Sequence, residues 1–489
     1  MRVHQVHERS SSSATLTRAA RGLSQRERRY DVVVVGGGNA GLVAAISARH
    51  QAESVLLLER APTWRRGGNS RHTRDIRYAH GPAEPFTTGE AYPQEELLDD
   101  LLRVGGGQNR ALAQLVVEQS CTVAEWMTQH GVRWQQPLTG TLHLGRTNRF
   151  FLGGGKALIN TYYQTAEAMG IEVEYEASVE DVLVRDGTSV AGVVVDRNGR
   201  QSEIHAGAVV LTSGGFEANL DWLRRYWGDA VDNYVIRGTP YNDGRVLASM
   251  LDKGAATAGD PKGFHAVALD ARAPRFDGGI ATRLDSIPFG IAVNKFGKRF
   301  YDEGQDFWPK RYAIWGRLIA EQPDQIAYSI VDSRMLDCFL TSLYRPFEAA
   351  SVGDLAHAMG LDAAAVCETV RAYNAAIRPG GRFDPGALDD CRTEGLDPPK
   401  SHWAVPIAEP PFSGYPLRPG ITFTYLGLAV DACTRVKMAD GRVMDNLFAA
   451  GEIMSGNVLS SGYLGGFGLT IGTVFGRIAG REAARYAIH

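Results

Sequence analysis

The 489-residue sequence has few cysteines, no long apolar run and almost no net charge. Its cysteines are Cys121, Cys338, Cys367, Cys391 and Cys433. They are scattered, odd in number and form no C-x-x-C pair, so neither a metal cluster nor a disulfide framework is indicated. No apolar segment approaches the length of a membrane span. A net charge of -3 gives no sign of a nucleic-acid surface. We therefore expect a cytoplasmic protein without a metal site, which neither spans a membrane nor binds nucleic acid.

Residues 1–29 are rich in Arg and Ser and lack the apolar core of a secretory signal, so we expect a disordered tail. The remaining chain is long enough for two or more domains with ample cores. It contains many glycines, several of them in clusters, among the 56 of the whole sequence. Glycine lets backbone approach a large ligand closely, and the clusters are therefore candidate ligand-binding loops.

The stretch from residue 30 to residue 60 has the pattern of a βαβ unit. Four consecutive valines, Val32 to Val35, predict a buried parallel strand. Residues 42–50 predict a helix packed through alanines, and residues 54–58 predict a second buried strand. Between the first strand and the helix stands G-x-G-x-x-G, and a carboxylate follows about 20 positions later. This combination predicts a bound dinucleotide.

Each part of that motif has a physical role. Gly36 makes the tight turn, Gly38 lets backbone approach a pyrophosphate, and Gly41 lets the helix lie close to the strand. The helix N-terminus offers N–H groups and partial positive charge to the phosphates. Glu59 can accept hydrogen bonds from ribose hydroxyls, which argues against NADP and its 2′-phosphate.

The βαβ pattern is interrupted in the middle of the chain. Residues 171–196 alternate like a small antiparallel sheet, and residues 208–216 form another buried strand that ends in glycines. After about residue 237 the pattern stops, and it returns in the last 76 residues. We predict an α/β fold: a discontinuous Rossmann-like domain (residues 30–236 and 414–489) with an inserted α+β capping domain (237–413).

Several further motifs carry a family resemblance. They are Gly-Gly-Asn-Ser at 67–70, Thr-Ser-Gly-Gly at 212–215, Ala-Gly-Glu at 450–452 and the glycine-rich loop before residue 468. With the βαβ unit, they resemble the flavoprotein family of fumarate reductase and succinate dehydrogenase over essentially everything after Tyr30. The resemblance implies FAD as the cofactor, with a mobile cap over the flavin. The positions it assigns to FAD are Gly36, Gly38, Asn39, Ala40, Gly41, Glu59, Arg60, Gly68, Asn69, Ser70, Thr212, Gly214, Gly451, Glu452, Gly468 and Leu469.

Three stretches look most like the tricarballylate dehydrogenase group and the related precorrin-3B synthase type flavoprotein: residues 67–74, 153–163 and 456–480. This likeness implies desaturation of a carbon–carbon bond next to a carboxylate, with tricarballylate to cis-aconitate as the best single candidate. It also implies a separate membrane-bound iron–sulfur partner as electron acceptor. Two alternatives stay open: a desaturase, oxidase or ene-reductase acting on a less anionic biosynthetic intermediate, and a flavin-binding assembly protein without turnover.

The resemblance also assigns catalytic roles in the cap. His265 and Thr282 match the positions that hold one substrate carboxylate. The run Val-Asn-Lys-Phe-Gly-Lys-Arg-Phe at 293–300 matches a family stretch that precedes a catalytic arginine, and Arg311 is the nearest candidate after it. An arginine needs help to move a proton because its pKa is very high. Candidates for that relay are Glu303, Asp306 and Lys310.

Two positions depart from the family pattern. Phe423 replaces a carboxylate-binding histidine, and Tyr463 replaces a carboxylate-binding arginine. Neither side chain can form bidentate, charge-assisted hydrogen bonds to a carboxylate, so fumarate and succinate themselves are poor candidate substrates. Tyr463 is either an acid beside the flavin or a ring packed on it. Other positive charges can bind carboxylates in a rearranged site, or else form a solvated face or contact the FAD phosphates: Arg71, His72, Arg74, Arg77, Arg146 and Arg149.

Overall fold

The computed structural model describes residues 29–106, 109–137, 144–276, 282–340 and 342–489. The predicted N-terminal tail, apart from residue 29, lies outside these residues. The core is a mixed sheet with strand order β18-β19-β9-β1-β2-β6, in which β1 runs parallel to both β2 and β9. The strands on this path are β1 (Arg29–Val35), β2 (Val55–Leu58), β6 (Glu172–Glu174), β9 (Arg200–Leu211), β18 (Arg435–Lys437) and β19 (Val443–Ala449). Strands from both ends of the chain therefore share one sheet.

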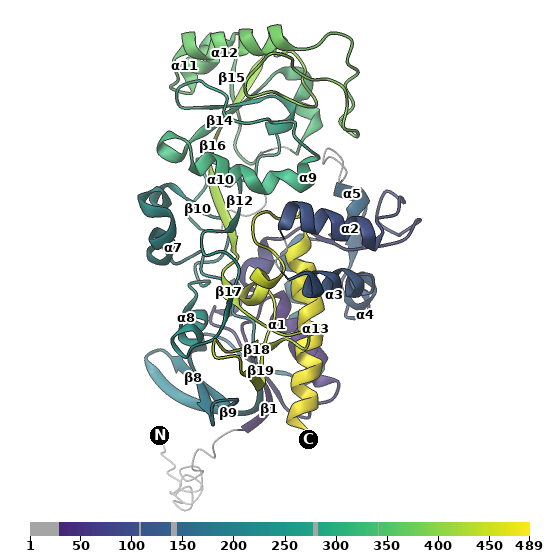
Figure 1. Ribbon diagram of the computed structural model, residues 1–489, viewed down its shortest axis with the longest axis vertical. Coiled ribbons are helices and arrows are strands. Elements are labelled where there is room, and N and C mark those ends of the chain that lie inside the picture. The colour runs from purple at the N-terminus through teal and green to yellow at the C-terminus, as the bar shows by residue number, and fades with distance from the viewer. Residues whose placement is uncertain (1–28, 107–108, 138–143, 277–281, 341) are drawn as a thin grey trace, which may run out of the picture.

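Helices from the two ends of the chain also pack together, as Figure 1 shows for α1 (Asn39–Arg49) and α13 (Phe467–Ala487). Glycines on α13 make this contact close. A Cβ added at Gly480 would lie 2.1 Å from the carbonyl oxygen of Ala44. The long C-terminal helix thus covers the N-terminal βαβ unit and closes the discontinuous domain.

The antiparallel sheet expected at residues 171–196 forms only in part. Strands β7 (Ser178–Arg185) and β8 (Ser189–Arg197) pair antiparallel, and β8 continues onto β9. Residues 171–175 do not join them, because β6 pairs parallel with β2 at the far edge of the main sheet. That parallel pairing places β6 in the same layer as the dinucleotide unit.

The cap has its own six-stranded sheet, organised on the 13-residue strand β16 (Phe412–Thr424). β16 pairs with four other strands, and it runs from the cap back toward the first domain (Figure 1). The other strands are β10 (Val235–Ile236), β12 (Phe264–Asp270), β13 (Ile291–Asn294), β14 (Ala327–Val331) and β15 (Phe347–Ala349). The cap helices are α9 (Trp308–Arg311), α10 (Trp315–Ala320), α11 (Val352–Ala358) and α12 (Ala363–Ala376). The domain boundaries at 237 and 413 stay a prediction.

The remaining elements surround these two sheets. The helices are α2 (Gln94–Asp100), α3 (Arg110–Ser120), α4 (Val123–Gln129), α5 (Leu144–Thr147), α6 (Gly154–Ala168), α7 (Leu220–Trp227) and α8 (Arg245–Asp252), and the strands are β3 (Asp75–Arg77), β4 (Trp134–Gln135), β5 (Asn148–Phe151), β11 (Thr257–Ala258) and β17 (Gly427–Leu428). Within the described ranges, no helix is both long enough and apolar enough to cross a bilayer.

Candidate active site

A cavity of about 1170 Å³ lies at the carboxyl ends of β1, β2 and β9; we call it the cofactor cavity. Of the sixteen residues that the sequence assigns to FAD, every one but Gly41 lines it. Gly41 instead lies behind the turn, where an added Cβ would be 1.8 Å from the carbonyl oxygen of Gly36. It therefore allows close packing of helix on strand, as the motif predicts.

The turn after β1 is fixed by backbone geometry. Gly36 has φ of 103°, and a Cβ there would lie 2.6 Å from the carbonyl oxygen of Thr212. The Thr212 hydroxyl donates to the carbonyl oxygens of Val35 (2.7 Å) and Gly36 (2.9 Å). Gly38 precedes α1 and has no side chain to cap it, and the Ser70 hydroxyl accepts a hydrogen bond from the Asn39 N–H (3.0 Å). The helix N-terminus therefore faces the cavity with backbone N–H groups suited to a pyrophosphate.

Glu59 lies at the end of β2, where the ribose acid is expected. It is buried and accepts hydrogen bonds from the backbone N–H groups of Ala61 (2.8 Å) and Gly67 (3.2 Å). Burial raises the pKa of its carboxyl group. The neighbouring Arg60 pairs with Asp243 at 2.7 Å, so its charge is already compensated at the cavity wall.

A pair of buried carboxyl groups lies on the opposite wall. Glu452 accepts a hydrogen bond from the backbone N–H of Thr424 (2.8 Å), and its carboxyl group is hydrogen-bonded to that of Glu217. Asn69 and Asn242 both donate to Glu217. Burial raises the pKa of Glu217 to about 7, and burial together with the Glu217 charge raises the pKa of Glu452 well above its usual range. The two groups therefore hold a shared proton.

The residues present fit FAD. The Asn39 side-chain oxygen is buried and has no hydrogen-bond donor in the described part of the chain, so a polar ligand atom can satisfy it. The cavity wall extends from Glu59 to Tyr463 and Gly468, and it includes the N-terminus of α1 and polar groups on several sides.

A second cavity, of about 690 Å³, adjoins the first. Five residues line both: Asn69, Thr73, Thr422, Tyr463 and Leu469. We call it the adjoining cavity. It lies between the FAD-binding domain and the cap, because its wall also contains Trp308 and Tyr312. A small molecule held there is next to whatever occupies the flavin end of the cofactor cavity.

Three arginines, Arg74, Arg237 and Arg283, line the adjoining cavity. Arg74 contacts Asp75 at 3.2 Å, and Arg283 contacts Asp285 at 2.9 Å. The Arg237 guanidinium donates to the carbonyl oxygen of His72 (3.2 Å), and burial lowers its pKa. Three guanidinium groups against two carboxylates leave the cavity with net positive charge when both carboxylates are ionised, which suits an anionic ligand.

Aromatic rings form another wall of the adjoining cavity. His265, only 1% exposed, stacks on Tyr463 with ring centroids 3.9 Å apart, and its edge meets Tyr312. Burial and the charge of Arg237 hold the pKa of His265 well below its usual range, so the imidazole is neutral. The Tyr463 hydroxyl accepts a hydrogen bond from the backbone N–H of Gly468 (2.9 Å). These contacts hold Tyr463 at the junction of the two cavities.

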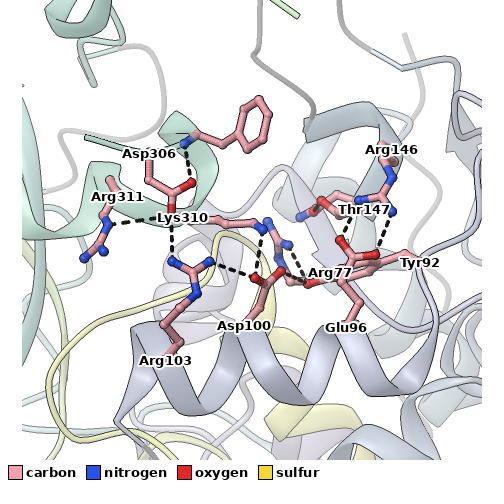
Figure 2. A network of polar contacts seen from close by, with 12 residues as sticks. Arg77, Tyr92, Glu96, Asp100, Arg103, Arg146, Thr147, Asp306, Lys310 and Arg311 are labelled. Carbon is pink, nitrogen blue, oxygen red and sulfur yellow. Dashed lines mark hydrogen bonds and ion pairs between the residues drawn. The ribbon is translucent and has the colours of Figure 1, made fainter. Parts of the chain in front are cut away.

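The structure brings together some predicted catalytic residues and separates others. His265 and Tyr463 line the adjoining cavity. Thr282 is buried with its carbonyl oxygen bonded to the N–H of Asp270 (2.9 Å), and it lines neither cavity. Arg311 lies on α9 and faces Asp306 at 3.8 Å (Figure 2), and it is not among the residues that line either cavity.

The wall of the adjoining cavity also contains three residues that no sequence motif indicated: Arg237, Arg283 and Tyr312. Arg283 directly follows Thr282, and Tyr312 directly follows Arg311, so the aligned positions were near the correct segments. The side chains that reach the cavity are their neighbours, and a one-residue offset is not visible in a motif match. Arg237 follows the two-residue strand β10 and has no motif of its own.

The candidates for the proton relay, and the basic residues considered as carboxylate ligands, also lie at different places in the structure. Glu303 pairs with Arg299, and none of Glu303, Asp306 and Lys310 lines the adjoining cavity. His72 and Arg74 do line it. Arg77 and Arg146 instead line an outer cavity of about 620 Å³ beside Lys310. Arg149 pairs with Glu84, and Arg71 donates to the carbonyl oxygen of Trp64 (3.3 Å).

Comparisons with known proteins agree with this geometry. The FAD binding domain family matches residues 31–469. NADH:fumarate oxidoreductase of Klebsiella pneumoniae (strain 342) is 28% identical, with 97% of this chain and 50% of that protein covered. The probable fumarate reductase Ifc3 of Shewanella frigidimarina (strain NCIMB 400) is 28% identical, with 94% and 75% covered. The open conformation of a flavocytochrome c3 fumarate reductase superposes with a TM-score of 0.72 at 25% identity, covering 94% of this chain and 79% of that one.

The chain belongs to the FAD binding domain family. The predicted resemblance to fumarate reductase flavoproteins, the α/β fold with an inserted cap and the FAD cofactor are confirmed. The chain spans half the length of the Klebsiella relative and three quarters of the Shewanella relative.

Proposed function

We propose that the chain is an FAD-dependent oxidoreductase that moves a hydride and a proton across a carbon–carbon bond next to a carboxylate. The observation that carries this proposal is the arginine-lined cavity that shares five wall residues with the cofactor cavity. A ligand there has its anionic group at the arginines and its carbon skeleton beside the cofactor. The relatives named as fumarate oxidoreductase and fumarate reductase support the same reaction class.

The residues of the chain supply binding, orientation and exclusion of water. Arg74, Arg237 and Arg283 bind carboxylate oxygens of the substrate. The stacked rings of His265 and Tyr463 form a flat apolar surface that orients the carbon skeleton. Bound FAD supplies the two-electron acceptor.

Tricarballylate is our specific candidate substrate, with cis-aconitate as its product. It carries three carboxylates, and the cavity offers three guanidinium groups from three different segments. Phe423 and Tyr463 stand where the fumarate reductase pattern has a histidine and an arginine, so this site is arranged for a different acid. We expect fumarate and succinate to bind more weakly than tricarballylate.

A second candidate function follows from the aromatic wall. His265, Tyr312, Tyr463 and Trp308 give the cavity a large ring surface, which suits a less anionic substrate with an unsaturated or cyclic skeleton. In that case the enzyme is a desaturase, oxidase or ene-reductase that uses the arginines for a single carboxylate.

The deciding measurement is the visible spectrum of the FAD-loaded protein under anaerobic conditions. Addition of tricarballylate is expected to bleach the oxidised flavin, and succinate is expected to do so more slowly. Full retention of the oxidised spectrum with tricarballylate would contradict that substrate. Bleaching by a monocarboxylate, or oxygen consumption with it, would favour the second candidate.

We further propose a separate protein as the electron acceptor, as the tricarballylate dehydrogenase resemblance implies. In the described part of the chain, no group of His, Cys, Asp or Glu is placed to hold a metal ion. Rapid bleaching of the flavin by NADH alone would favour a nicotinamide partner instead. The cytoplasmic location stays a prediction from the scattered cysteines.

A further inference from the structure

One buried carboxyl group in the adjoining cavity has no role in the function proposed above. Asp75, on β3, is 5% exposed. It is the only carboxylate among the described residues that line this cavity. The family-like stretch at residues 67–74 ends directly before it, and no sequence motif assigned it a function.

The contacts of Asp75 hold its carboxylate in place without filling its hydrogen-bonding capacity. The Asn148 amide donates to one oxygen (2.8 Å), and the Arg74 Nε donates to the other (3.2 Å). An ionised carboxylate has about four acceptor sites, so each oxygen can accept another proton or hydrogen bond. Asn148 is itself fixed, because it also donates to the carbonyl oxygen of Gly465 (2.8 Å) and accepts from the Thr147 hydroxyl (2.7 Å).

Charged and titratable groups on several elements surround Asp75. They are Arg74 and Arg77 from its own segment, Arg237 after β10, Asp285 from the cap, and the hydroxyl groups of Tyr312 and Tyr463. Burial is the largest effect and raises the pKa of Asp75 to about 6, against the opposing influence of Asn148, Arg77 and Arg237. The group therefore exchanges a proton near neutral pH, where an acid–base catalyst is most effective.

The other polar groups in the cavity are less suited to accept a proton. Arginines stay protonated. Burial and the charge of Arg237 hold the pKa of His265 well below its usual range, so it is a weak base. Burial raises the pKa of Tyr312 to about 12 and raises that of Tyr463 further. Both tyrosines are therefore protonated and cannot take up a proton from the substrate.

We propose that Asp75 is the acid–base catalyst of the site, which accepts the proton released from the substrate carbon. This inference rests on the proposed function. In the dehydrogenation direction, one C–H bond gives up a hydride to the bound FAD, and the C–H bond on the neighbouring carbon gives its proton to Asp75. The electron pair left on that carbon becomes the new carbon–carbon π bond. In the reducing direction, protonated Asp75 returns the proton. This assignment leaves the arginines with binding alone.

A binding titration tests the proposal without turnover. Oxalate is the probe, because it has no C–H bond to oxidise and stays a dianion over the pH range of the titration, and its binding is followed by the flavin absorbance of the FAD-loaded protein. In the wild type, affinity is expected to fall about tenfold as the pH rises through 6, because ionised Asp75 repels the anion. In Asp75→Asn this pH dependence disappears. Asp332→Asn is the control, because it removes a buried, ion-paired carboxylate elsewhere in the cap, and it is expected to keep the pH dependence of binding.

Steady-state turnover provides a second test of the proposal. With a carboxylate that bleaches the flavin, Asp75→Asn is expected to lower kcat by about 100-fold or more, while FAD content and KM change little. Asp75→Glu is expected to restore part of kcat. The proposal is overturned if oxalate binding by the wild type is independent of pH, if Asp75→Asn keeps the pH dependence, or if it keeps kcat within about tenfold. If no carboxylate bleaches the flavin, the proposed function fails, and the oxalate titration alone decides whether Asp75 titrates in the cavity.

Discussion

The two cavities of this protein are built in different ways. The cofactor cavity depends on backbone: a turn at Gly36, the start of α1 and the ends of parallel strands bring N–H groups and close contacts to one place. The adjoining cavity depends on side chains from β3, β12, α9 and the loops after β10 and before β13. Backbone geometry tolerates few substitutions, whereas side chains at a cavity wall can be exchanged. In this chain we therefore expect the first cavity to fix the cofactor and the second to determine the substrate.

The largest effect is expected where the backbone requirement is strongest. Gly41→Ala places a Cβ 1.8 Å from the carbonyl oxygen of Gly36, and a backbone atom cannot move aside without opening the turn. We expect the free energy of unfolding to fall by about 3 kcal/mol or more and FAD to be lost. The FAD-to-protein ratio and the thermal transition measure both.

Gly81→Ala is the matched control, because nothing lies within 4 Å of the added Cβ. It is expected to change stability by less than about 0.5 kcal/mol. If Gly41→Ala bound FAD as tightly as this control, the close helix–strand contact would not be needed for the cofactor cavity.

This contrast explains how much the sequence could predict. The glycines, Glu59 and Glu452 have fixed spacing, so fifteen of sixteen assigned residues line the cofactor cavity. The catalytic residues have no such spacing. The segments around residues 282 and 311 were in the right region, but Arg283 and Tyr312 reach the cavity in place of Thr282 and Arg311. Arg237 and Asp75 meet across two domains, a proximity that depends on the cap's docking and cannot be obtained from local patterns.

The second prediction compares two cap arginines. Arg283→Gln is expected to lower kcat/KM by about 100-fold to 1,000-fold, because it removes a desolvated charge that meets the substrate carboxylate. Arg311→Gln is expected to lower it by less than about tenfold, since Arg311 lies outside the cavity. Steady-state kinetics with FAD content checked for each variant measures this. A larger loss in Arg311→Gln would return the catalytic role to the residue that the family pattern indicates.

The third prediction concerns the carboxyl pair of the cofactor cavity. The folded-state pKa of Glu217 is raised to about 7 from an ordinary 4.5, so its contribution to stability is fully present below pH 4.5 and is lost as the pH rises through 7. We expect the wild type to lose up to about 3 kcal/mol between pH 5 and pH 8 through this pair. Glu217→Gln keeps the shape and donates to Glu452, so it is expected to lose less.

Thermal unfolding at the two pH values measures this difference. Glu118→Gln, at an exposed site on α3, is the control and is expected to follow the wild type. An equal loss in wild type and Glu217→Gln would mean that the pair does not take up the proton inferred from its burial.

The smallest effect on stability is expected at the ion pairs between the first domain and the cap. Arg103, in the helical turn after α2, pairs with Asp306 of the cap at 2.8 Å, and Lys310 on α9 pairs with Asp100 at 2.8 Å (Figure 2). Because the Arg103 side chain is 42% exposed, its pair is screened by solvent, and Asp306→Asn is expected to cost only about 0.5–1 kcal/mol. Thermal unfolding at low and high salt tests this, since salt should lower the stability of the wild type toward that of the variant. A different result would be an Asp306→Asn variant that keeps its stability and still loses most of its turnover. That result would show that these ion pairs contribute to the reaction, in addition to the residues that line the adjoining cavity.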